Sequence, residues 1–473
     1  MIDEGLKSIK PIGIKQYIIM SKNKRHLGLS VFVQLYGTHA HAWRRPGTRA
    51  GGNPDLSEWA SLVQLLERGK FDFAFFADFV GMGGDEVGNG RRARGRNFEP
   101  LTLVAALATV TKNIGLVATV NTNFNDPYNL ARRFASLDHL TGGRSGWNVV
   151  SSLTPSSANT FGIDPATTPD RRYERAAEFI DVARKLWDSW DDGSFDHPDK
   201  ETGKFYSPES GHPVNHQGDH FKIDSLLDIA RPVQGYPVIF QAGNSDQGRE
   251  FAAQYAEVIY AAAQTIEEGQ AFYRDVKGRL AKYGREPDDL KVTPGLYYFI
   301  GSSRQEAQDK YQSFLDAVDL SGRKRQLMGV DVSNLSLDAP LPDNLPEPTN
   351  GRGRWRQLVE LGRREKLTIR ELILRFSTVQ GHRIIVGTAN DIADQLEEWF
   401  LGGAADGFNM KPALLPDDLE DFINGVVPEL QRRGIFRKEY EFSTLRENLG
   451  LRRPPNPFSG ENLSEAKSTL VEA

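Results

Sequence analysis

Two short apolar segments of the chain each carry polar side chains that could bind a ligand where they end. Thr119 lies in segment 116–120 and Asn148 in segment 147–150, and both segments are typical of strands buried on both faces. The spacing between them predicts a helix, so that the three elements form one βαβ unit. Ligands bind at the carboxyl ends of parallel strands, which makes Thr119 and Asn148 candidate site residues. The alternative is that these residues only begin loops.

A second candidate site follows the apolar segment 237–242. Gly243 permits a tight turn, and Ser245 is placed to cap the helix that the pattern predicts through Ala256. A helix N-terminus with free N–H groups and a nearby hydroxyl is a natural phosphate site. The alternative is an ordinary serine cap that binds no ligand.

Basic side chains lie on the loops that follow the first two predicted strands. His39 and His41 could move a proton, or could only form hydrogen bonds within their loop. Four arginines on the second loop could pair with carboxylates, or could belong to a mobile, solvated loop. They are Arg91, Arg92, Arg94 and Arg96.

Two other patterns do not meet the requirements of the sites that they suggest. Gly81 and Gly83 begin a possible dinucleotide loop, but acidic residues follow where a pyrophosphate would lie. Three histidines recur every four residues, but Pro213 and Gly218 disfavour the helix that would bring them to one metal ion. These histidines are His212, His216 and His220. We expect no metal site.

The composition limits the class of protein. The chain has 473 residues, a formal net charge of −5 and no cysteine. The net negative charge argues against bulk affinity for nucleic acid, and the lack of cysteine excludes disulfides and thiolate nucleophiles. No segment reads as a membrane span, and the N-terminus has no secretory pattern. We therefore expect a cytoplasmic protein that binds neither nucleic acid nor membranes.

The candidate residues need a fold that brings strand ends together. Apolar segments alternate with predicted helices, and about eight of them read as buried strands, which favours a TIM-like (β/α)₈ barrel over a doubly wound open sheet. The segments are residues 27–35, 71–77, 116–120, 147–150, 237–242, 258–263, 293–300, 384–386 and 407–410.

Three parts of the chain are expected from these patterns. Residues 1–26 form an N-terminal extension, residues 27–451 a single barrel domain, and residues 452–473 a polar tail that frays. Within the barrel domain, polar or proline-rich stretches at about 191–235 and 321–383 are expected to be long insertions.

Longer stretches of the sequence resemble a known family of enzymes. They include THAHAWRRP, LLERGKFDFAFFAD, FNDPYNLARRFASLDHLTGGRSGWNVVSS, ARPVQGYPVIFQAG and AADGFNMKP, and the resemblance extends over nearly all of residues 27–451. It is to the two-component, reduced-flavin-dependent monooxygenases of the bacterial luciferase-like superfamily. More narrowly, it is to the group with nitrilotriacetate and EDTA monooxygenases, pristinamycin synthase and dibenzothiophene sulfone monooxygenase.

The resemblance implies a barrel that uses FMNH₂ from a separate NAD(P)H:flavin oxidoreductase. Carried over by position, Asp78 and Thr119 would lie beside the isoalloxazine ring, and Asn148 would face its reactive edge. Thr119 and Asn148 would then stabilise charge during oxygen activation, and His39 is a candidate for proton transfer.

The phosphate end of the cofactor is assigned by the same resemblance. Tyr173 would reach the phosphate together with a strand-to-helix turn made of Gly243, Asn244 and Ser245. The family often has a histidine where this chain has Pro169, so one contact is lost or is replaced by Arg172 or Asn244.

The favoured reaction is oxidative C–N cleavage of an amine or aminopolycarboxylate, in which Arg92 and Arg94 would bind the anionic substrate. Oxygenation at sulfur or C–S cleavage of a thioether or sulfone is the alternative within the family. A deazaflavin-dependent dehydrogenase and a flavin-binding protein without catalysis are alternatives from other classes. The family suggests homodimers or homotetramers.

Overall fold

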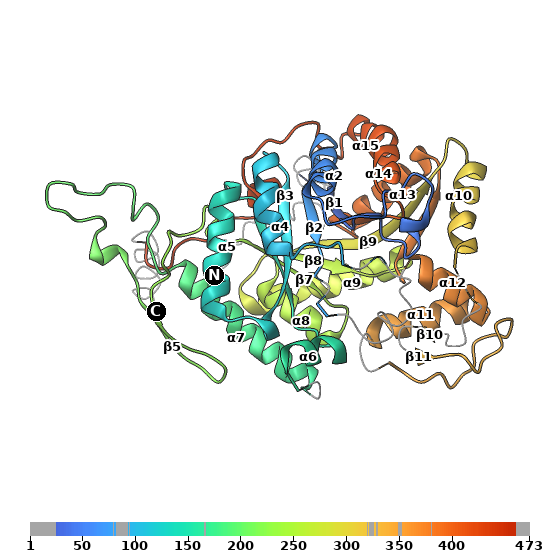
Figure 1. The fold of residues 1–473 in the computed structure, drawn as a ribbon, viewed down its shortest axis with the longest axis horizontal. Helices are drawn as coiled ribbons and strands as arrows, with labels where there is room; N and C mark the ends of the chain where they lie inside the picture. Colours follow the sequence, from blue (N-terminus) through green and yellow to red (C-terminus); the bar gives the residue numbers. More distant parts are fainter. Residues whose placement is uncertain are drawn as a thin grey trace, which may run out of the picture.

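A closed ring of eight parallel strands forms the centre of the molecule in the computed structural model (Figure 1). The structure describes residues 25–78, 80–81, 93, 95–164, 167–318, 320, 326–327, 330–348, 352–379 and 381–459. Pairing of Gly28 with Gly407 joins the first and last strands of the ring and closes it. The strands are β1 (Gly28–Phe32), β2 (Phe73–Phe76), β3 (Gly115–Asn121), β4 (Ser145–Val150), β7 (Val238–Ala242), β8 (Val258–Ala261), β9 (Lys291–Ile300) and β13 (Gly407–Pro412). The predicted TIM-like barrel is confirmed.

A ninth parallel strand, β12 (Arg383–Gly387), lies outside the ring. The first residues of β9 pair with β8, and its later residues, from Leu296 onward, pair with β12. The sequence pattern could not distinguish β12 from a strand of the ring, because this partly buried strand has an apolar run like theirs.

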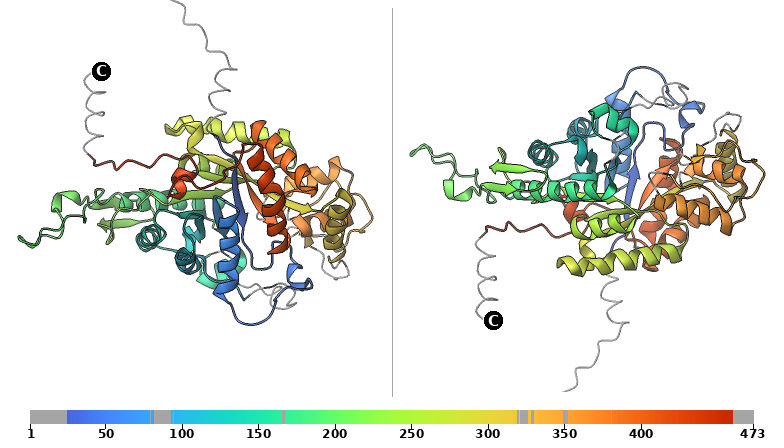
Figure 2. Two further views of the ribbon diagram at one scale, coloured as in Figure 1. Left: turned by 90° about the horizontal axis from the view of Figure 1, so that it is seen from above. Right: turned by 90° about the horizontal axis from the view of Figure 1, so that it is seen from below.

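Helices surround the barrel and cover the outer face of the strands (Figure 2). In α5, which forms where the sequence predicts the helix of the βαβ unit, Asp126 caps the N-terminus, Pro127 is the first residue and Gly142 ends the helix with φ of 65°. The helices are α2 (Leu56–Arg68), α4 (Pro100–Leu107), α5 (Pro127–Thr141), α6 (Pro155–Phe161), α7 (Pro169–Trp187), α8 (Asp246–Tyr255), α9 (Ile266–Arg279), α10 (Arg304–Asp316), α13 (Ala389–Leu401), α14 (Asp417–Asp421), α15 (Val427–Arg432) and α16 (Leu445–Asn448). Among the described residues, none of the helices has the length and apolar character of a membrane span.

Alternate residues of each strand face the helices or the interior of the barrel, which we call the lumen. Trp147 points outward, and its ring lies 5.4 Å from that of Phe134 on α5. Phe73 and Phe240 point inward and meet with ring centroids 4.8 Å apart. Side chains of this inner cluster fill the lumen below the carboxyl ends of the strands, so that only the upper end is available for a ligand.

Residues 191–235, which we call the arm, project away from the barrel (Figures 1 and 2). The arm contains an antiparallel hairpin of β5 (Val214–Gln217) and β6 (Lys222–Ser225). Its histidines serve separate contacts: His212 pairs with Asp191 at 2.8 Å and His216 with Glu178 at 3.0 Å. In the described part of the chain, no group of three or more His, Asp or Glu side chains has the arrangement of a metal site.

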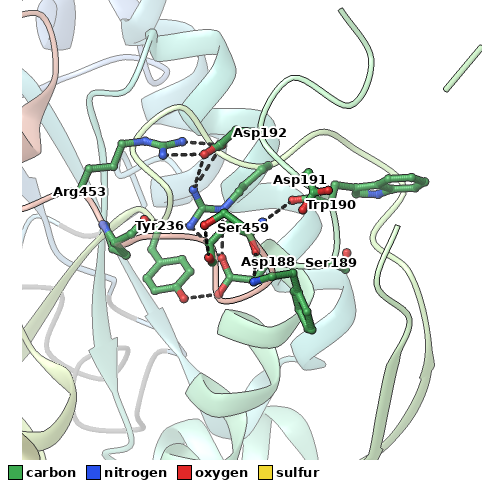
Figure 3. Close-up of polar contacts among 12 residues, drawn as sticks. Asp188, Ser189, Trp190, Asp191, Asp192, Tyr236, Arg453 and Ser459 are labelled. Atoms are coloured by element: carbon green, nitrogen blue, oxygen red, sulfur yellow. Dashed lines mark hydrogen bonds and ion pairs between the residues drawn. The ribbon is translucent and has the colours of Figure 1, made fainter. Parts of the chain in front are cut away.

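Residues 452–459 are the described part of the C-terminal tail, and they pack against the base of the arm rather than fraying. Arg453 pairs with Asp192 at 2.7 Å (Figure 3). The Asn456 amide donates to the carbonyl of Trp190 at 2.8 Å, and the Phe458 ring stacks on His212 at 4.0 Å.

The second long segment, between α10 and β12, carries a small apolar core of its own. It contains α11 (Arg352–Arg364) and α12 (Ile369–Val379), together with the short pair β10 (Gln326–Leu327) and β11 (Val330–Asp331). Trp355, Leu358 and Leu372 are buried in that core. The segment lies beside the barrel near α10, where Figure 1 draws it in orange.

Candidate functional site

Thr119 and Asn148 lie side by side at the carboxyl end of the barrel. They are paired residues on the neighbouring strands β3 and β4, and the Asn148 amide donates to the Thr119 hydroxyl at 3.0 Å. Their exposures are only 5% and 3%. The amide oxygen of Asn148 is buried and has no hydrogen-bond partner among the described residues. A buried acceptor in this state needs a ligand or water, so the predicted pair fits a binding site.

Three further polar side chains face the same end of the lumen and were missed in the sequence. They are Tyr260 on β8 and Asn409 and Lys411 on β13, and with Thr119 and Asn148 we call them the polar rim. The Tyr260 hydroxyl and the Asn409 amide oxygen are buried without a partner among the described residues. Burial raises the pKa of Tyr260 well above its usual value, so its hydroxyl stays protonated.

A period-two signal for part of this rim is present in the sequence. In residues 408–411, Phe408 and Met410 face the outer core, and Asn409 and Lys411 alternate with them. Polar residues that alternate with apolar ones indicate a strand whose inner face lines a polar space.

The predicted phosphate site is built at the start of α8. The Ser245 hydroxyl accepts a hydrogen bond from the backbone N–H of Gly248 at 3.1 Å, which is the predicted N-cap. A hydrogen bond joins the Tyr173 hydroxyl to the Ser245 side chain, and burial raises the pKa of Tyr173. Added to Gly248, a Cβ atom would lie 3.1 Å from the Cα of Gly243. The two glycines therefore let the turn approach the helix closely.

The region around Pro169 supplies a cation next to Tyr173. Pro169 is the first residue of α7, which places Tyr173 one turn further along the helix. Arg172 donates to the carbonyl of Leu153 at 3.4 Å, and its Nε is buried without a partner among the described residues. Arg172 thus has an unused donor where the resemblance expects a lost histidine contact.

Asn244 is tied to the second long segment. Its side-chain amide donates to the carbonyl of Ala262 at 3.2 Å, and the amide of Gln357 on α11 donates to the same carbonyl at 3.1 Å. Gln357 was not found in the sequence, because nothing in the pattern shows that α11 reaches the end of β8.

Asp78 lies two residues beyond β2 and is half-buried. Phe76 pairs with Ala118, so Asp78 leaves its strand at the same end of the barrel as Thr119. Its predicted place beside a flavin ring stays a prediction.

His39 is packed inside its loop. Its Nδ1 accepts from the backbone N–H of His41 at 3.2 Å, and its ring meets that of Phe314 on α10 at 4.8 Å. Burial, together with the nearby His41 and Arg45, lowers the pKa of His39 to about 3. The ring is therefore neutral at physiological pH, and its predicted role in proton transfer stays a prediction.

The arginine loop is described only in part. Arg91, Arg92 and Arg94 lie outside the described residues. Arg96 is held within the protein: it pairs with Glu58 at 2.8 Å and donates to the carbonyl of Asn53 at 3.0 Å. Arg96 therefore binds the start of α2 and the residues before it, and its charge is paired with Glu58 rather than with a substrate.

Comparisons with known proteins agree with this geometry. The model of the family "Luciferase-like monooxygenase" matches residues 36–406. Nitrilotriacetate monooxygenase component A of Aminobacter aminovorans is 46% identical over 92% of this chain and 99% of its own. N-acetyl-S-(2-succino)cysteine monooxygenase of Bacillus subtilis is 40% identical over 93% and 100%. The structure of EDTA monooxygenase from Chelativorans sp. BNC1 matches with a TM-score of 0.78 and 32% identity, covering 91% of this chain and 100% of that one. The chain therefore belongs to the luciferase-like monooxygenase family and is a flavin-dependent monooxygenase.

Proposed function

We propose that this enzyme takes FMNH₂ from a separate NAD(P)H:flavin reductase and uses O₂ to oxidise a small carboxylated amine next to its nitrogen. The observation that carries the proposal is the order of three strands: β3, β4 and β7 are neighbours in the barrel. They bring Thr119, Asn148 and the Ser245 turn to the same end. A flavin ring at the polar rim with its phosphate at α8 would span these neighbours.

The residues present fit flavin mononucleotide. The start of α8 offers free backbone N–H groups, the Ser245 and Tyr173 hydroxyls and the unused Nε of Arg172 for a phosphate. The glycine pair at 243 and 248 gives the cofactor's chain a close approach to the backbone. The unpartnered amide oxygen of Asn148 provides an acceptor for a ring N–H.

The proposed reaction is a hydroxylation followed by bond cleavage. One oxygen atom of O₂ enters the C–H bond next to nitrogen and the other leaves as water, with two electrons from the reduced flavin. The hydroxylated carbon then loses its bond to nitrogen and becomes an aldehyde, while nitrogen keeps the electron pair and takes a proton.

Bound reduced flavin supplies the reaction with O₂. The chain's own residues keep the site dry and polarised. The ring of Phe75 packs against Tyr260 of the polar rim with centroids 4.7 Å apart, and this packing limits the access of water. Thr119 and Asn148 are pre-oriented by their mutual hydrogen bond. The Thr119 O–H and the second amide N–H of Asn148 are the donors that can stabilise negative charge during oxygen activation.

The separate reductase is supported by the relative from Aminobacter aminovorans, which is named as component A of its enzyme. A homodimer or homotetramer remains our proposal for the assembly. The cofactor could be exchanged in its reduced state because the described site lies at the open end of the barrel.

Oxidation next to sulfur is the second candidate, because a relative of 40% identity acts on a succinated cysteine. Both relatives are named for small substrates that carry several carboxylates, and they differ in the heteroatom. We therefore propose a carboxylated substrate, with oxidation next to nitrogen as the first candidate and oxidation next to sulfur as the second.

A coupled assay tests the proposal. The purified enzyme, a generic flavin reductase, NADH, FMN and O₂ are mixed with nitrilotriacetate, with N-acetyl-S-(2-succino)cysteine or with a sulfone, and products are analysed by mass spectrometry. Glyoxylate and a shortened amine would support C–N cleavage. Sulfur products alone would move the enzyme to the second candidate. In a separate reaction with an alcohol and oxidised deazaflavin, turnover to reduced deazaflavin without O₂ uptake would contradict both.

A further inference from the structure

A buried lysine that the sequence pattern did not single out lies at the carboxyl end of the barrel. Lys411 is the second-to-last residue of β13, and its exposure is 6%. Met410, the residue before it, packs in the outer core, so Lys411 faces the lumen. Its Nζ lies 3.8 Å from the centroid of the Phe32 ring.

The surroundings of Lys411 are aromatic and close. Lys411 is paired in register with Tyr297 on β9, and its Nζ is 6.0 Å from that ring. A Cβ atom on Gly295 would lie 3.2 Å from the Cε of Lys411, so the glycine makes room for this side chain. An ammonium group among aromatic rings is held by cation–π attraction and is shielded from water, which strengthens its attraction for an anion.

Lys411 and Asn148 lie on opposite walls. In the closed ring, β13 is separated from β4 by β1, β2 and β3 on one side and by β9, β8 and β7 on the other. The Ser245 turn follows β7, the neighbour of β4. A cofactor between the start of α8 and the Thr119–Asn148 pair therefore occupies the wall away from Lys411.

We propose that Lys411 binds a carboxylate of the substrate and holds the carbon to be oxidised toward Thr119 and Asn148. The inference rests on the proposed function and adds to it the residue that selects an anionic substrate. Lys411, in the lumen, then binds the anionic substrate in place of Arg92 and Arg94, for which the sequence predicts that role.

The experiment compares acids with their neutral esters. Steady-state KM and kcat are measured with nitrilotriacetate and with its trimethyl ester for the wild type, Lys411→Met and Lys411→Arg. Lys222→Met, an exposed lysine of the hairpin, is the matched control. Affinity for oxidised FMN, from quenching of its fluorescence, and thermal stability are measured for each variant without turnover.

We expect Lys411→Met to raise KM for the acid by about tenfold or more, as for loss of a hydrogen bond to a charged group. KM for the ester and the affinity for FMN should change by less than about twofold. Lys411→Arg should recover part of the loss because it keeps the charge.

Three results would overturn the proposal. The first is an equal rise in KM for acid and ester. The second is weakened FMN binding with KM unchanged, which would place Lys411 at the cofactor. The third is a wild type that oxidises the ester in preference to the acid. If the wild type oxidises neither, the proposed function fails, and calorimetric titration of nitrilotriacetate into FMN-loaded wild type and Lys411→Met decides whether Lys411 binds the acid.

Discussion

At the scale of single residues, the site depends on buried polar atoms whose partners are few. The Thr119 hydroxyl accepts a hydrogen bond from the amide N–H of Asn148, and the amide oxygen of Asn148 is left for a ligand. A buried amide that loses its partner costs about 1–3 kcal/mol, so this pair is sensitive to small changes.

Thr119→Val removes the hydroxyl and keeps the shape of the side chain. The Asn148 amide then lacks its acceptor and its orientation is lost. We expect kcat to fall by about tenfold to a hundredfold, while FMN still binds. Thr119→Ser keeps the hydroxyl and serves as the control. Equal kcat for Thr119→Val and wild type in the coupled assay would show that the hydroxyl has no part in the reaction.

His39 makes the stability of the fold depend on pH. Its pKa is about 3 in the folded protein, below the ordinary value near 6.5, because the ring is buried. Between these two values the unfolded chain binds a proton that the folded chain does not, so stability falls as the pH is lowered from 6.5 toward 3.

Urea unfolding at pH 7 and pH 5 tests this assignment. The wild type should lose up to about 2 kcal/mol through His39 over this interval, and His39→Gln should lose that much less. His197→Gln, at an exposed position, should behave as the wild type does. The same pH dependence in His39→Gln and wild type would rule out the proposed cause.

At the scale of elements, the turn from β7 into α8 has two separable tasks. The Ser245 hydroxyl caps the helix, and it also faces the space in which we place the phosphate. A cap contributes about 1 kcal/mol to the stability of a helix wherever it occurs, whereas a phosphate contact affects only phosphorylated ligands.

Ser245→Ala should therefore weaken FMN binding by about tenfold and leave riboflavin binding nearly unchanged, because riboflavin has no phosphate. Ser303→Ala removes the equivalent cap of α10 and is the control for the loss of a cap alone. Both affinities can be measured by fluorescence quenching. A parallel loss of riboflavin affinity would assign Ser245 to the fold of the turn rather than to the phosphate.

These elements also show what the sequence could predict. The βαβ unit from Gly115 to Val150 was predictable, since capping residues, helical spacing and buried strands all agree locally. Lys411 was missed because a lysine after an apolar run reads as the beginning of a loop. Gln357 was missed because its contact with the carbonyl of Ala262 joins residues far apart in the sequence. The segment of β12 was predicted as one of the alternating strands, and only its pairing with the later residues of β9 shows that it lies outside the ring.

At the scale of the whole molecule, the C-terminal tail and the arm stabilise each other away from the site. Figure 3 shows Arg453 reaching Asp192 beside the pair of Asp188 and Tyr236. The Arg453 pair is about half exposed and contributes little. Asn456 is 3% exposed and has its amide on the carbonyl of Trp190, so it carries more of the attachment.

Asn456→Ala should lower the stability of this attachment by about 1–3 kcal/mol and make the arm more sensitive to limited proteolysis. Activity should be retained, since the arm base is remote from the polar rim. Asn344→Ala, at an exposed position of the second segment, is the control. If cleavage within residues 191–235 is no faster in Asn456→Ala than in the control, the tail does not hold the arm.

The reaction that we propose for this barrel is transfer of one oxygen atom from O₂ to a carboxylated substrate with reduced FMN. The most direct measurement supplies FMNH₂ from a flavin reductase under ¹⁸O₂ and follows nitrilotriacetate and N-acetyl-S-(2-succino)cysteine by mass spectrometry. We predict a substrate-dependent product that contains one atom of ¹⁸O when trapped before exchange with water. Turnover that yields product without ¹⁸O, or that proceeds equally well without O₂, would contradict the claim.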